Sequence, residues 1–119
     1  MRDPRARFSA LCLSLPEARA EEQGRHASFA VRRRRFAWYL DDHQGDGRLS
    51  AHLRAAPGRN RQLAQAAPQS FFIPAYLGPR GWAGVHLDLE QADWKEIEGL
   101  VLEAYLLAAP KRLAERLSV

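Results

Sequence analysis

Four consecutive arginines, Arg32, Arg33, Arg34 and Arg35, lead directly into the aromatic segment Phe36-Ala37-Trp38-Tyr39. A guanidinium group is permanently charged, and its planar fork of N–H donors matches two oxygens of a phosphate. Neighbouring aromatic rings offer faces on which nucleobases or further guanidinium groups stack. Because like charges on a rigid strand repel one another, the run favours an anionic partner. The other interpretation is a solvated hairpin tip that keeps a small domain soluble.

The positive charge is concentrated in the first half of the chain. Residues 1–61 contain 13 arginines and no lysine against seven acidic residues, a net charge of +6, whereas residues 62–119 have a net charge of −2. A nucleic-acid-binding face requires a local excess of this kind. Hydrophobic residues make up 46% and charged residues 27% of the 119 residues, which is typical of a folded globular chain, and we expect one domain over residues 1–119.

Several other classes of protein lack their sequence signals here. The single cysteine, Cys12, excludes an internal disulfide and a cysteine-rich zinc site. The chain has no glycine-rich phosphate loop and no Gly-x-Ser-x-Gly nucleophile motif. It has no apolar run long enough for a membrane helix, and its first residues lack the apolar segment of a secretory signal. We therefore expect a cytoplasmic monomer without cofactor or membrane contact.

Hydrophobic periodicity predicts the order helix, three strands, helix, strand, helix. We expect helices at residues 4–15, 57–66 and 93–108, and strands at residues 27–31, 35–41, 48–54 and 82–89. Residues 17–25 are polar and are expected to form a connection. The economical packing of these elements is an α+β fold, with a four-stranded antiparallel sheet and helices on one face. The predicted core consists of Phe8, Leu11, Phe29, Leu49, Leu53, Val85, Leu87, Ile97 and Val101.

Residues 68–81 form a long irregular connection with three prolines, the kind of segment that often carries function. Four of its side chains are too apolar for a free loop, and we expect several of them to be buried: Phe71, Phe72, Ile73 and Tyr76.

Strand alternation predicts the contents of the sheet face that lacks helices. Its members are expected to be Arg35, Tyr39, His52, Arg54, Trp82 and His86. Arginines beside Tyr39 and Trp82 are typical of a nucleic-acid platform. Alternatively, the hairpin tips alone, residues 32–35 and Arg48, contact the phosphate backbone. His52 and His86 with Asp88 form a possible metal site, but no short ligand spacing supports it and isolated strand histidines are usually structural.

The chain resembles the YjbR (MmcQ-like) family of small bacterial proteins over residues 8–117. The hairpin Ala27-Ser28-Phe29-Ala30-Val31 with Arg34-Arg35-Phe36-Ala37 is similar to the first hairpin of that family. A strand ending Arg54-Ala55-Ala56-Pro57 and the segment Pro74-Ala75-Tyr76 leading to Trp82 also match its pattern. Glu103-Ala104-Tyr105 followed by Ala109-Pro110-Lys111-Arg112 resembles its final helix. Here Glu-Ala-Tyr replaces the usual acidic-Ser-Tyr pattern, and arginines replace the glycine-like residues of the hairpin tip.

The resemblance implies a two-layer, frataxin-like α/β architecture and a DNA-binding role through projecting hairpins, a double wing. The arginines at the first tip strengthen phosphate binding in this chain. We therefore predict that it contacts the DNA backbone with weak or no sequence specificity, through Arg32, Arg33, Arg34, Arg35, Arg48, Arg54, Arg80, Tyr39 and Trp82. Two alternatives stay open: a small-molecule-binding protein or enzyme that uses the histidine-bearing face, and an adaptor for an acidic protein.

Overall fold

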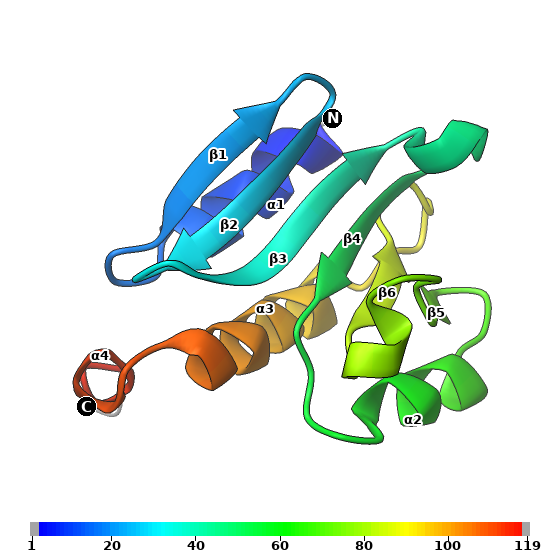
Figure 1. Cartoon of the computed structure of the whole chain (residues 1–119). Coiled ribbons are helices and arrows are strands. Elements are labelled where there is room, and N and C mark those ends of the chain that lie inside the picture. The colour runs from blue at the N-terminus through cyan, green and yellow to red at the C-terminus, as the bar shows by residue number, and fades with distance from the viewer. Residues whose placement is uncertain (1–2, 118–119) are drawn as a thin grey trace.

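One antiparallel sheet of six strands organises the computed structural model, which describes residues 3–117 (Figure 1). The strand order across the sheet is β1-β2-β3-β4-β6-β5. The strands are β1 (Arg19–Gln23), β2 (His26–Val31), β3 (Arg34–Asp41), β4 (Leu49–Leu53), β5 (Phe71–Phe72) and β6 (Ala83–His86). The helices are α1 (Pro4–Leu13), α2 (Arg59–Ala66), α3 (Trp94–Ala108) and α4 (Lys111–Glu115), with short 3₁₀ turns η1 (His43–Gly45) and η2 (Gly78–Arg80).

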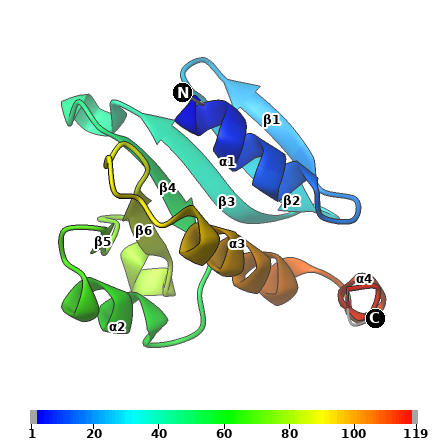
Figure 2. The ribbon, with the colours of Figure 1, turned by 180° about the vertical axis from the view of Figure 1, so that it is seen from behind.

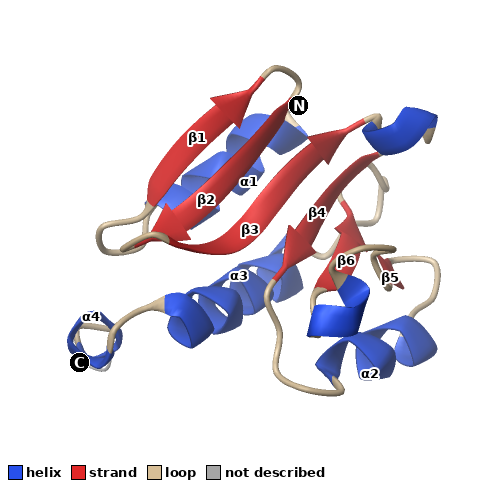
Figure 3. Ribbon diagram, in the orientation of Figure 1, coloured by secondary structure: helices blue, strands red, loops and turns tan. Residues whose placement is uncertain are grey.

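The expectation of four strands was wrong, because two strands lack the alternation that identifies the others. β1 lies within the predicted connection at residues 17–25, and all five of its residues are exposed because it forms an edge of the sheet. β5 is only two residues long and lies at the opposite edge, within the predicted irregular connection. The expected α+β class, with an antiparallel sheet and helices, is confirmed (Figure 3).

α1 and α3 cover one face of the sheet, as the view from behind shows (Figure 2). α3 begins after Asp93, whose carboxylate accepts a hydrogen bond from the backbone N–H of Glu96 at 3.0 Å. Its buried side chains recur at helical spacing toward the sheet: Ile97, Leu100, Val101, Ala104, Tyr105 and Ala108. Within residues 3–117, the face opposite α1 and α3 carries no α-helix, only the connection with η2 near β5 and β6, and it is called the open face below (Figure 3).

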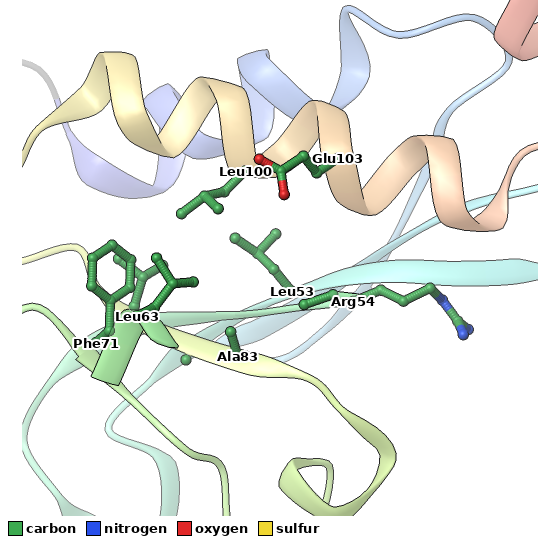
Figure 4. A pocket seen from close by; sticks show the side chains of 10 residues that line it. Leu53, Arg54, Leu63, Phe71, Ala83, Leu100 and Glu103 are labelled. Atoms are coloured by element: carbon green, nitrogen blue, oxygen red, sulfur yellow. The ribbon is translucent and has the colours of Figure 1, made fainter. Parts of the chain in front are cut away.

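Seven of the nine predicted core residues are buried between the sheet and the helices: Phe8, Phe29, Leu53, Val85, Leu87, Ile97 and Val101. Leu11 and Leu49 are only partly buried and pack against this core. In Figure 4, Leu53, Leu63 of α2, Phe71 and Leu100 surround a gap between α2, α3 and the sheet. Its volume is about 10 Å³, room for roughly one water molecule. This gap is therefore too small for a ligand.

A bulge in β3 changes which side chains reach the open face. Phe29 pairs with Ala37 and Ala30 pairs with Arg35, so Phe36 is an extra residue without a partner in β2. Phe36 and Ala37 are consecutive, yet both are fully buried on the helix side. The alternation therefore shifts by one residue after the bulge. Tyr39 consequently faces the helices, and its predicted place on the open face was wrong.

The connection at residues 68–81 is only partly buried. Phe71 lies in the core and Phe72 is half-buried, as expected. Ile73 and Tyr76 are 46% and 74% exposed, so the expectation of burial was wrong for them. The Phe72 ring lies directly over Gly84, where an added Cβ would be 2.3 Å from a ring carbon. Glycine at position 84 is therefore what allows this connection to lie against the sheet.

Candidate nucleic-acid interface

The turn between β2 and β3 is built from Arg32 and Arg33, which both have positive φ, 50° and 74°. A two-residue hairpin turn with positive φ at both positions is normally made of Asn and Gly, because a side chain in the left-handed region costs about 1–2 kcal/mol. Arginines at both positions therefore indicate that their side chains have a role that outweighs the conformational cost of the turn. The turn directs its arginines to different sides of the hairpin.

Arg32 is directed away from the open face and is already paired. Its Nε and Nη2 donate to the two carboxylate oxygens of Glu17 at 2.5 and 3.0 Å. The hydrogen bond from Arg32 lowers the pKa of the Glu17 carboxyl, so the pair stays ionised at neutral pH. The charge of Arg32 is therefore neutralised within the chain.

The other three arginines of the run help to line a hollow of about 560 Å³ on the open face. We call it the arginine hollow; its lining is Glu21, Ala30, Arg33, Arg34, Arg35, Trp38, Arg54, Leu77, Arg80 and Trp82. The structure thus brings together six of the nine predicted site residues: Arg33, Arg34, Arg35, Arg54, Arg80 and Trp82. They come from the β2–β3 hairpin, the end of β4 and the segment that precedes β6.

The five arginines of the hollow have no ion-pair partner among residues 3–117, although other arginines of the same region do. The pKa of Arg54 is lowered, first by burial and then by repulsion from Arg34 and Arg80. Its Nε donates to the backbone carbonyl of Arg35 at 2.9 Å, which fixes the guanidinium beside the bulge. Mutual repulsion of this kind is relieved when an anion binds between the groups.

Two arginine–tryptophan pairs form walls of the hollow. The guanidinium carbon of Arg35 lies 5.0 Å from the ring centre of Trp38, and that of Arg54 lies 5.2 Å from the ring centre of Trp82. Both distances are within the range of cation–π attraction, which holds the guanidinium groups over the rings. The buried amide of Asn60 fixes the backbone on either side of Arg80, since its Nδ2 donates to the carbonyls of Trp82 at 3.0 Å and Gly78 at 3.2 Å.

Three predicted site residues lie elsewhere. Arg32 is paired with Glu17, as described above, and Tyr39 is buried on the helix side with the Arg5 guanidinium 5.4 Å from its ring centre. Arg48 donates two hydrogen bonds of 2.9 Å to the carboxylate of Asp88. It is not among the residues that line the hollow.

Sequence reasoning missed the position of Trp38, which takes the place predicted for Tyr39. The aromatic run at residues 36–39 could have indicated Trp38 as a site residue. The sheet face that Trp38 occupies, however, depends on the bulge. Trp38 pairs with His52 of β4, and both side chains are on the open face. Glu21 was missed because β1 itself was not predicted.

A second hollow of about 590 Å³ adjoins the first, and Trp38 and Leu77 line both. We call it the histidine cleft, because three of the four histidines line it: His26, His43 and His52. Their rings follow one another edge to face, with 5.9 Å between the centres of His26 and His43 and again between those of His43 and His52. Burial, and then repulsion from His43, lowers the pKa of His52 to about 4, so its ring is neutral at pH 7.

The remaining histidine, His86, is stacked under Phe72 at a ring separation of 4.7 Å. Its Nδ1 is buried and has no hydrogen-bond partner in the described part of the chain. Burial lowers its pKa, with a further contribution from Arg48. The metal site considered for His52, His86 and Asp88 is not assembled, since residues 3–117 contain no group of three or more histidine, cysteine or acidic side chains arranged to hold a metal ion.

A model of the YjbR family matches residues 13–107, and the chain therefore belongs to this family, as the sequence motifs indicated. The fold is similar to the crystal structure of protein DR2400 from Deinococcus radiodurans, which has a domain of the DUF419 family. The TM-score is 0.74 at 23% sequence identity, over 100% of this chain and 93% of that one. A comparison with curated proteins finds no match. No helix within residues 3–117 is long and apolar enough to cross a membrane.

Proposed function

We propose that the protein binds nucleic acid through the phosphate backbone, in the arginine hollow. The observation that carries this proposal is the convergence of Arg33, Arg34, Arg35, Arg54 and Arg80 on one concave surface without acidic partners among the described residues. Phosphate oxygens supply the missing charge and accept the paired N–H donors of each guanidinium. Among the described residues that line the hollow, Glu21 alone is acidic.

The binding has weak sequence specificity, because contacts to phosphates position a nucleic acid without reading its bases. The arginines project from a hairpin turn and from the ends of strands, so a backbone can reach them without entering a narrow opening. The two tryptophans hold their arginines in place. This arrangement agrees with the hairpin-based role that the family resemblance implies.

An anisotropy titration with a fluorescent DNA duplex at low salt tests the proposal. The double variant Arg34→Ala/Arg35→Ala removes two charges from the hollow, whereas Lys95→Ala/Lys111→Ala removes two exposed charges from α3 and α4. We expect the first variant to raise the Kd for the duplex by more than tenfold, from hydrogen bonds to charged groups worth about 1.5–3 kcal/mol each. The second variant should change the Kd far less.

Equal effects of the two variants would show that only net charge matters and would contradict the assignment to the hollow. A competitor separates nucleic acid from an acidic protein partner. Poly-glutamate that displaces the duplex at equal charge concentration would favour the adaptor alternative. A duplex that resists this competitor supports nucleic acid as the ligand.

A further inference from the structure

The histidine cleft has the size and lining of a site for a small, flat and uncharged group. Its volume of about 590 Å³ lies within the range of about 300–1,000 Å³ that is typical of ligand sites. η1 forms one wall and residues 72–77 form the other, while Trp38, Leu40, Ser50 and His52 lie between them on the strands. Most of this surface is aromatic or aliphatic.

Two apolar side chains at the rim remain in solvent. Tyr76 is 74% exposed and Ile73 is 46% exposed, and both line the cleft. Both side chains thus present apolar surface to the same cleft, where a bound ligand would cover it. Their apolar character, which led us to expect burial, is explained if the cleft is occupied when the protein functions.

The polar groups of the cleft suit a neutral partner with hydrogen-bonding edges. Among the described residues that line it, none is an arginine or lysine, and Asp46 disfavours a second phosphate. His26 Nδ1 accepts a hydrogen bond from the backbone N–H of Asp41 at 3.1 Å, which leaves Nε2 as the ring nitrogen that can donate. Gln44, Ser50 and His52 add further donors and acceptors.

The two hollows adjoin each other at two shared side chains. Trp38 and Leu77 each contribute to both linings, so a ligand with a phosphate among the arginines extends directly into the cleft. A nucleotide joins an anionic phosphate to a flat, uncharged ring with hydrogen-bonding edges. These two parts match the arginine hollow and the histidine cleft.

We propose that the histidine cleft receives one unpaired nucleobase whose own phosphate lies in the arginine hollow, with Tyr76 and Trp38 as stacking surfaces. This inference rests on the proposed function and adds to it the class of ligand, since a base paired within a duplex cannot enter the cleft. The nucleotide belongs to a single strand or is a free mononucleotide.

The test measures affinity for a labelled oligo-dT strand, for an abasic strand of equal length and charge, and for a duplex. We expect the wild type to bind oligo-dT roughly tenfold more tightly than the abasic strand, as for stacking of one base on aromatic side chains. Tyr76→Ala should remove most of this difference and leave duplex binding unchanged. Leu106→Ala, which shortens an exposed apolar side chain of α3, is the matched control and should retain the difference.

A second arm identifies the source of the base. Thymidine monophosphate is titrated against the wild type while the ring signals of the histidines are followed by NMR. Saturable shifts that Tyr76→Ala abolishes, with equal affinities for the two strands, assign the site to a free nucleotide. Equal affinities for oligo-dT and the abasic strand, without such shifts, overturn the inference. In that case a persisting effect of Arg34→Ala/Arg35→Ala on duplex binding leaves the proposed function intact, whereas absence of all binding overturns both.

Discussion

The guanidinium carbon of Arg35 lies 5.0 Å from the ring centre of Trp38, although the two residues are three positions apart in one strand. In a regular strand, residues three apart point to opposite faces. The bulge at Phe36 removes this separation and places both side chains on the open face. The same shift turns Tyr39 toward the helices. One extra residue therefore determines that the ring of Trp38, and not that of Tyr39, lies beside the arginines.

Replacement of Trp38 should affect both hollows, because its ring lines each of them. We expect Trp38→Leu to weaken binding of duplex and of oligo-dT, as it releases Arg35 in one hollow and removes a stacking surface in the other. Trp94→Leu is the matched control, since Trp94 is the first residue of α3 and its ring centre lies 4.6 Å from the guanidinium carbon of Arg7 in α1. Equal losses of affinity in both variants, measured by anisotropy, would count against a role for Trp38.

Adjacent arginines of the hairpin should differ in their effect. Glu17→Gln/Arg32→Asn removes a paired acid and base together and keeps the net charge, and asparagine tolerates the positive φ of position 32. We expect duplex affinity to stay at the wild-type level in this variant, while Arg34→Ala alone weakens binding. A loss of affinity in the charge-neutral variant as large as that in Arg34→Ala would show that Arg32 also contacts the ligand.

Gly84→Ala should destabilise the fold because the new Cβ would lie 2.3 Å from the ring of Phe72. Overpacking of this kind costs about 1–3 kcal/mol in the free energy of unfolding. Denaturant titrations of Gly84→Ala, Phe72→Leu and the double variant form a cycle that isolates the contact. Additive losses in the double variant would contradict a direct clash between position 84 and the ring.

Stability should fall in mild acid because of His52. Its pKa in the folded protein is about 4, below the ordinary 6.5, chiefly because of burial. Between pH 6.5 and 4 the His52 ring is therefore protonated in the unfolded chain but neutral in the folded protein. The free energy of unfolding decreases as the pH falls through this range, by about 3 kcal/mol for this group. His52→Gln should flatten this part of the profile, as measured by urea titrations at pH 7, 6, 5 and 4.5. A variant profile parallel to that of the wild type would refute the assignment.

Much of the fold could be predicted because the sequence carries its periodicities clearly. Residues such as Ile97, Val101 and Tyr105 recur at helical spacing, and Phe29 and Val31 alternate as in a strand. β1 was missed because an exposed edge strand needs no apolar face, and its residues Arg-Ala-Glu-Glu-Gln resemble a loop. Local patterns therefore identify buried elements better than edges.

Most arginines of the site could be predicted from charge, and Trp82 from strand alternation, whereas the second ring, Trp38, could not. The bulge that exchanges Tyr39 for Trp38 has no glycine to mark it, because Phe36 and Ala37 both fit the core. The pairing of Arg32 with Glu17 depends on a contact between residues 15 positions apart. Likewise, the exposure of Tyr76 follows from the path of the connection over Gly84 and from the open cleft beside it.

The dependence of duplex affinity on salt concentration tests the central claim most directly. If each of the five arginines of the hollow neutralises one phosphate, the plot of log K against log salt has a slope of about −4.5, from about 0.9 for each contact. Arg34→Ala/Arg35→Ala should reduce the magnitude of the slope by about 1.8, since two contacts are lost. Lys95→Ala/Lys111→Ala should leave the slope unchanged. A wild-type slope near zero, or the same slope in the wild type and the Arg34→Ala/Arg35→Ala variant, would contradict phosphate binding in the arginine hollow.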